Sequence, residues 1–166
     1  MTWKTLFFDF DGRIGRKQWW LATLALLTVS LSLSILVNPS AYFSESEGPT
    51  AARGPDTLLS LAFLIPETAV TVKRFNDRDW PQWLPYAYAL FVAAFTMADH
   101  HRLIFVADEP TTIDIAIIIG GFAIALAVII DNGMLRGTVG PNRYGEDPLG
   151  TDEITASVRV PHREAT

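Results

Sequence analysis

A stretch without a single charged residue, from Gln18 to Ser44, constrains this chain more than any other feature. Within it, residues 19–37 form an apolar segment that would span about 28 Å as an α-helix, close to the roughly 30 Å hydrocarbon thickness of a bilayer. Ten of its residues are Leu, Ile or Val, which together favour insertion by about 3 to 6 kcal/mol. The alternative, a cleaved signal peptide, usually has a shorter apolar region, and "NPSAYF" is a poor cleavage site. We therefore expect an uncleaved transmembrane helix over 19–37.

Three weaker apolar runs follow, at residues 57–72, 81–98 and 111–130. Each alone is also compatible with a buried helix of a soluble domain. The basic residues favour the membrane interpretation. If all four runs cross, only Arg53 and Arg102 lie on one side, and eleven basic residues lie on the other: Lys4, Arg13, Arg16, Lys17, Lys73, Arg74, Arg78, Arg136, Arg143, Arg159 and Arg163. The positive-inside rule then places both termini in the cytoplasm.

The composition agrees with this arrangement. Hydrophobic residues make up 49% of the chain and charged residues 19%, against about 25% charged in a typical soluble domain. The sequence thus predicts an all-α membrane protein: one domain over 1–150, folded as a four-transmembrane-helix bundle, and a loosely ordered cytoplasmic tail over 151–166.

The N-terminal residues predict an amphipathic segment that lies in the membrane interface. Its apolar residues recur at helical spacing: Trp3, Leu6, Phe7, Phe10 and Ile14. A short helix would bury this face in the interface and leave Lys4 and Arg13 toward headgroups and water. The tryptophans Trp19 and Trp20 then fit an aromatic belt at the same boundary.

A cluster of charged residues is the main candidate site. Four crossing helices would bring two groups to one membrane face, and these are Arg13, Arg16 and Lys17, and Lys73, Arg74, Asp77 and Arg78. Guanidinium and carboxylate groups form bidentate hydrogen bonds, so we expect mainly structural ion pairs. The alternative is a site for an anionic lipid or phosphate, because basic residues near the surface attract anionic headgroups by about 1 kcal/mol each.

Glu67 is the one charged residue inside the second apolar run, next to Pro66. An intramembrane acid is a functional candidate by default. Because Lys73 follows only six residues later, a structural ion pair near the cytoplasmic side is the favoured interpretation, and a proton or ion relay is the alternative.

Other classes of function are disfavoured. The net charge of −5 argues against a nucleic-acid binder, and the absence of cysteine excludes thiolate metal sites. The segment with Asp99, His100, His101, Asp108 and Glu109 lacks a metal-ligand spacing, so we expect a solvated loop and no metal. No catalytic or nucleotide-binding motif is present, and we expect no cofactor and no enzymatic activity. The spacing of Gly121 with Ala125 and of Ala123 with Ala127 predicts close helix packing, within or between protomers.

Three motifs carry a family resemblance: "GRIGRKQWW" before the first apolar run, "VKRFNDRDWPQWL" after the second, and "GPNRYGEDP" after the last. In this order they resemble the domain-of-unknown-function 805 family (DUF805, YhaH-like), small bacterial inner-membrane proteins. The resemblance covers roughly residues 3–148. It implies a bundle of about four helices in the inner (plasma) membrane and supplies no activity. Asn76 stands where that family commonly has His.

The expected function is therefore a non-enzymatic membrane scaffold or accessory protein that binds anionic lipid at its cytoplasmic face. The alternative is a small oligomeric transporter or channel that uses Glu67, and a membrane-embedded enzyme ranks third. The expected partners are the bilayer with its anionic phospholipid headgroups, and a second copy or another membrane protein.

Overall fold

The computed structural model describes residues 2–43, 53–104 and 111–150, and the regular elements of this part of the chain are helices. The elements are α1 (Trp3–Phe8), α2 (Arg16–Val37), α3 (Ser40–Phe43), α4 (Arg53–Asp77), α5 (Trp83–His100) and α6 (Thr112–Ile129), which continues into the π-helix η1 (Ile130–Met134). The described residues contain no β-strand, only an isolated bridge between Asn142 and Gly145. The all-α prediction is confirmed, whereas the tail predicted over 151–166 lies outside the described residues.

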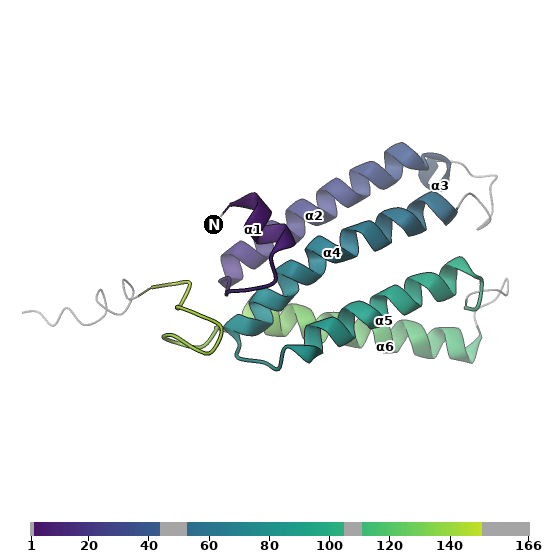
Figure 1. Cartoon of the computed structure of the whole chain (residues 1–166). Coiled ribbons are helices and arrows are strands. Elements are labelled where there is room, and N and C mark those ends of the chain that lie inside the picture. The colour runs from purple at the N-terminus through teal and green to yellow at the C-terminus, as the bar shows by residue number, and fades with distance from the viewer. Residues whose placement is uncertain (1, 44–52, 105–110, 151–166) are drawn as a thin grey trace, which may run out of the picture.

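The long helices run side by side, and α4 is the central one (Figure 1). It packs against α1, α2 and α5, while α6 joins the bundle through η1, which contacts α2 and α4. Figure 1 shows that α1, the turn between α4 and α5, and the segment after η1 lie at the same end of the bundle. We call this the charged end; α3 and the end of α5 lie at the opposite end.

Polar residues fix the starts of α1 and α6 through capping boxes. In α6, the Thr111 hydroxyl accepts a hydrogen bond from the Asp114 backbone N–H at 3.2 Å, and the Asp114 carboxylate accepts one from the Thr111 N–H at 2.9 Å. Thr2 and Thr5 form the equivalent pair in α1. These bonds satisfy N–H groups that have no partner within the first turn of a helix.

Two of the described helices are long and apolar enough to cross a membrane, α2 and α6 with η1. Almost none of either helix is buried, whereas the core helix of a soluble protein would be covered. Ile113 and Phe122 of α6, for example, are each 70% exposed. The helices α4 and α5 fall below this apolarity, so length and composition support two crossing helices and not the expected four.

The core lies where α1 and α2 meet α4. Its residues show that the N-terminal segment is not the interfacial amphipathic segment that the sequence predicted. Helix α1 ends at Phe8, and Ile14 is completely buried with Val70, whereas an interfacial face was expected to hold it. Trp19 is also buried, at 4% exposed, and so does not belong to an aromatic belt. The reason is that the extended segment before α2 turns inward: the Ile14 N–H donates to the carbonyl of Lys73 at 3.4 Å.

The glycines of η1 and α6 differ in how closely other side chains approach them. A methyl group at Gly133 would lie 2.8 Å from Trp20 and 3.0 Å from Trp19, so glycine allows η1 to pack against α2. At Gly120 and Gly121, in contrast, no atom would lie within 4 Å of such a methyl group. The close packing expected of the small residues in α6 is therefore not found within the chain at these two positions.

Candidate functional site

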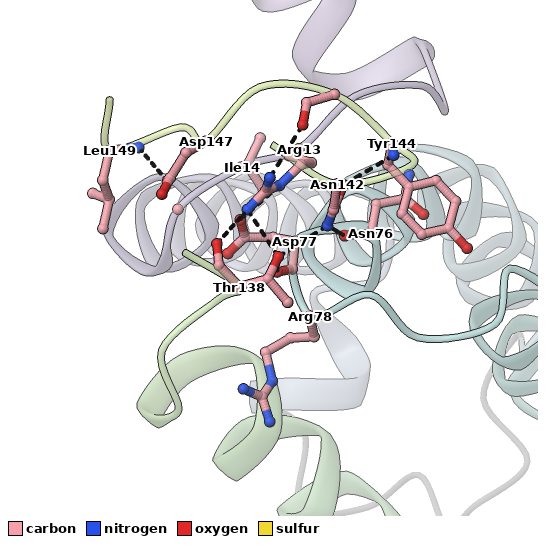
Figure 2. Close-up of polar contacts among 12 residues, drawn as sticks. Arg13, Ile14, Asn76, Asp77, Arg78, Thr138, Asn142, Tyr144, Asp147 and Leu149 are labelled. Atoms are coloured by element: carbon pink, nitrogen blue, oxygen red, sulfur yellow. Dashed lines mark hydrogen bonds and ion pairs between the residues drawn. The ribbon is translucent and has the colours of Figure 1, made fainter. Parts of the chain in front are cut away.

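Arg13 and Asp77 form a buried ion pair at the charged end (Figure 2). The Nε and Nη2 groups of Arg13 donate to Asp77 Oδ1 at 3.1 and 2.9 Å. Arg13 is only 6% exposed, which corrects the expectation that it points to headgroups and water. The ion pair of Arg13 and Asp77 thus joins the "GRIGRKQWW" motif to the "VKRFNDRDWPQWL" motif, as expected of a structural pair.

The same guanidinium also holds the segment after η1. Its Nη1 donates to the carbonyls of Gly140 and Gly145 at 2.8 and 3.1 Å, and its Nη2 donates to the carbonyl of Thr138 at 2.7 Å. Arginine presents five N–H donors in a fixed plane, and here its terminal nitrogens and Nε all have acceptors. Arg13 therefore connects three stretches of the chain that are far apart in sequence.

Arg74 forms the second contact to Asp77 and links α4 to η1. Its Nη1 donates to Asp77 Oδ2, its Nε to the carbonyl of Asn132 at 2.6 Å, and its Nη2 to the carbonyl of Leu135. The side chain is completely buried. Arg74 was a candidate for lipid binding, but its hydrogen-bonding groups are already engaged, so its role is structural.

Asp77 accepts hydrogen bonds from both Arg13 and Arg74. It is the last residue of α4 and lies five positions past the expected membrane span 57–72. Burial raises the pKa of its carboxyl, and the adjacent Arg74 and Arg13 oppose that rise. A methyl group at Gly137 would lie 1.9 Å from Asp77 Oδ2. The backbone after η1 therefore lies directly against the carboxylate, and only glycine fits at this point.

Asn142 of the "GPNRYGEDP" motif forms hydrogen bonds with the "VKRFNDRDWPQWL" motif (Figure 2). Its side-chain amide donates to the carbonyl of Asn76 and to the Thr138 hydroxyl, both at 2.9 Å. The Tyr144 hydroxyl donates to the carbonyl of Trp80 at 2.8 Å. Asn76 in turn donates to the carbonyl of Gly12 at 3.0 Å, so the three motifs form one continuous hydrogen-bonded unit.

Asp147 closes the turn that carries this third motif. Its carboxylate accepts hydrogen bonds from the backbone N–H groups of Gly140 at 2.9 Å and Leu149 at 3.0 Å. Partial burial pushes its pKa up, but these two backbone bonds and the charge of Arg13 outweigh burial and hold the pKa below its usual value. The turn that supplies acceptors to Arg13 is thus itself fixed by a carboxylate.

The remaining candidates lie around this unit. Arg78 pairs with Asp131 at 3.2 Å. Lys73 does not join the ion pairs, because its ammonium donates to the carbonyls of Leu6, at 3.0 Å, and Asp9. It therefore holds the end of α1 against α4.

An open cavity of about 390 Å³ adjoins the cluster. Arg16, Lys17 and Arg136 line it with exposed side chains, and the buried Arg74 and Asp77 line it from inside the cluster. Arg16 and Lys17 begin α2, whose first turn contains no acidic residue. Arg16 donates to the carbonyl of Met134 at 2.9 Å, and neither it nor Lys17 forms an ion pair in the described part of the chain. The cavity therefore has a net positive lining.

Glu67 stands apart from the charged cluster. Among the described residues it forms no ion pair, and Lys73, its expected partner, contacts backbone carbonyls at α1. The favoured interpretation of Glu67 as a structural pair was therefore wrong. Asp99 and the two histidines lie at the end of α5, while Asp108 and Glu109 lie outside the described residues.

Comparison with known proteins identifies the family. Residues 7–146 match the family described as "Protein of unknown function (DUF805)". The chain belongs to the DUF805 family. It is 30% identical over 150 residues to "Uncharacterized protein YiiR" of Escherichia coli strain K12, covering 89% of this chain and 90% of that protein, and equally similar to the protein of that name from E. coli O157:H7. No solved structure shows significant similarity to the chain.

Several residues of this DUF805 cluster were not predicted as part of the site: Asn132, Gly133, Gly137, Thr138, Asn142 and Asp147. Two of them, Asn142 and Asp147, belong to the "GPNRYGEDP" motif, which indicated the family without indicating a contact. Their spacing around two glycines was the available signal, since Asn and Asp side chains commonly cap turns by accepting backbone hydrogen bonds. Asn132 acts through its backbone carbonyl, which any residue carries, so no sequence pattern marks it. Thr138 acts through its carbonyl and also through its hydroxyl, which accepts from Arg13 at 3.1 Å and from Asn142 at 2.9 Å.

Proposed function

We propose that this DUF805 protein is a non-enzymatic scaffold or accessory protein of the bacterial inner membrane. In this proposal α2, α4, α5 and α6 all cross, the charged end faces the cytoplasm, and the cavity there binds the phosphate of an anionic phospholipid headgroup.

The distribution of charge supports four crossings. Among the described residues, α4 begins at Arg53 and α5 ends shortly before Arg102, and these two helix ends lie opposite the charged end (Figure 1). The other described basic residues belong to the elements at the charged end. The helices α4 and α5 have the same course as the more apolar α2 and α6, and they lie beside them (Figure 1). Because α4 is central in the bundle, its Thr68 and Thr71 side chains are half-buried against neighbouring helices. Polar residues that face the interior of a bundle are tolerated in a crossing helix.

The cavity at the charged end is the observation that carries the lipid proposal. Asp77 already receives both Arg13 and Arg74, and Asp131 receives Arg78. The positive charge left after pairing is concentrated at Arg16 and Lys17, on one wall of this 390 Å³ cavity. A phosphate headgroup supplies the missing anion, and arginine binds phosphate with paired N–H groups.

The test is lipid retention by the full chain in mild detergent, measured by native mass spectrometry with phosphatidylglycerol and phosphatidylcholine in equal amounts. We expect selective retention of phosphatidylglycerol. Replacing both Arg16 and Lys17 with Gln should weaken it by about 30-fold, since two basic residues contribute about 2 kcal/mol together.

The matched control replaces Lys4 and Arg143 with Gln, which removes the same charge from the same end but leaves the cavity lining intact. Equal losses in the two double variants would show that only general surface charge attracts the lipid, and would contradict a specific site. A third arm adds inorganic phosphate. If free phosphate displaces the lipid at similar concentration, the site recognises phosphate itself and the lipid chains contribute nothing.

A further inference from the structure

Glu67 lines two cavities between the helices, one on each side of it along α4. The cavity toward the charged end has a volume of about 210 Å³, and the one toward the opposite end has about 380 Å³. Both are lined by Glu67, Leu64 and Val92, so these three side chains lie between the two cavities.

Hydroxyl-bearing side chains line this path on both sides of Glu67. Toward the charged end these are Thr23, Thr68, Thr71 and Tyr88, and toward the opposite end they are Ser30, Ser34, Tyr42, Ser60 and Thr96. The Trp19 side chain also lines the smaller cavity, and its buried indole N–H has no acceptor in the described chain. Water in the cavity would satisfy such a donor, because buried waters occupy sites with several polar groups.

No positive charge faces Glu67 from any described element that lines these cavities. Tyr88 of α5 shares the smaller cavity, and Asp56 of α4 shares the larger one. Asp56 accepts hydrogen bonds from Ser34 at 2.7 Å and Asn38 at 2.6 Å. Helix α6 contributes apolar side chains, and α2 contributes none that is charged.

A carboxylate without a counter-ion is costly within a membrane, and the neutral carboxylic acid costs far less. A proton is therefore the counter-ion that the site can accept. A metal ion needs several ligands, and the described residues hold no group of three His, Cys, Asp or Glu that would provide them.

We propose that Glu67 is a proton-binding site within the membrane, which exchanges its proton with water that enters from the Asp56 end. The step is a reversible transfer of one proton between water and the Glu67 carboxylate, so charge and atoms balance. The inference rests on the proposed crossing of α4 but is independent of lipid binding at the charged end. Such a site would provide the proton-coupled step of a carrier, the alternative role that an intramembrane acid indicates.

The first test is infrared difference spectroscopy of the full chain in liposomes, between acidic and alkaline pH. We expect a protonated carboxyl band that titrates in the wild type, disappears in Glu67→Gln and persists in Asp56→Asn. Because the measurement on the wild type needs no substitution, it also covers the case in which a variant fails to fold. Absence of the band from the wild type, or its persistence in Glu67→Gln, would overturn the proposal.

The second test is water access, measured with a small charged thiol reagent added on the Asp56 side. Glu67→Cys should react, whereas Ile65→Cys, at similar depth but outside both cavities and 54% exposed on the outer surface of the bundle, should be protected. Protection of both positions would overturn access from that side. Reaction at both would show instead that α4 does not cross the membrane, which refutes the proposed topology on its own.

Discussion

The buried pair of Arg13 and Asp77 predicts non-additive and unequal losses of stability. Removing one partner of a buried ion pair typically costs about 3 to 5 kcal/mol, because the other charge is left uncompensated. In Asp77→Ala both Arg13 and Arg74 lose their carboxylate, whereas in Arg13→Ala the carboxylate keeps Arg74. We therefore expect Asp77→Ala to lie at or above the upper end of that range and Arg13→Ala nearer the lower end. The double variant should lose at least about 2 kcal/mol less than the sum of the two.

The assay is chemical denaturation of the full chain in detergent, followed by tryptophan fluorescence. Arg143 and Asp79 provide the matched control, since their charged groups are 3.0 Å apart, against 2.9 Å in the buried pair, but their side chains are 57% and 46% exposed. Their coupling should stay below about 1 kcal/mol, as is usual for surface pairs. If the Arg13–Asp77 coupling were as small as that of the control, the buried cluster would not be the unit that joins the three motifs.

Three further outcomes are expected from the same region. Gly137→Ala should lower the melting temperature, because the new methyl group would lie 1.9 Å from Asp77 Oδ2, whereas Gly120→Ala, with open space around it, should preserve or raise that temperature. Asn76→His keeps a donor for the Gly12 carbonyl and should be tolerated, but Asn76→Leu should cost about 1 to 3 kcal/mol on denaturation, since it leaves that acceptor unpaired. Asp147 has a lowered pKa in the folded state, so its contribution is present above the unfolded value of about 4 and is lost as pH falls through the folded value. The melting temperature of Asp147→Asn, measured against pH, should therefore fall less steeply than that of the wild type in this acidic range.

The helices and the general position of the charged cluster follow from simple patterns in the sequence. The uncharged run at 19–37 predicts most of α2, which begins at Arg16, because continuous apolar length is a strong signal. The pair of Arg13 and Asp77 could be anticipated only as two groups on one face. The burial of Arg13 could not be anticipated from the sequence. It depends on the glycine-rich segment after η1, which folds over Arg13 and supplies carbonyl acceptors.

The predicted ion pair of Glu67 failed for a geometric reason. Residues six apart in an α-helix are rotated by about 120° from each other, so Glu67 and Lys73 leave α4 in different directions. Lys73 lies toward α1, and Glu67 lies toward cavities formed with α2 and α5. Glu67 and Lys73 are close in sequence, but they lie on different faces of α4 and therefore do not form an ion pair.

The sidedness of the two ends of the bundle in cells decides whether α2, α4, α5 and α6 all cross the membrane. The chain has no cysteine, so single cysteines can be placed at exposed positions: Phe43 and Leu103 at the end opposite the cluster, and Gln82 and Glu146 at the charged end. An impermeant thiol reagent should label Phe43→Cys and Leu103→Cys in spheroplasts, but Gln82→Cys and Glu146→Cys only after lysis. Labelling of Gln82→Cys before lysis would contradict four crossings with the charged end in the cytoplasm.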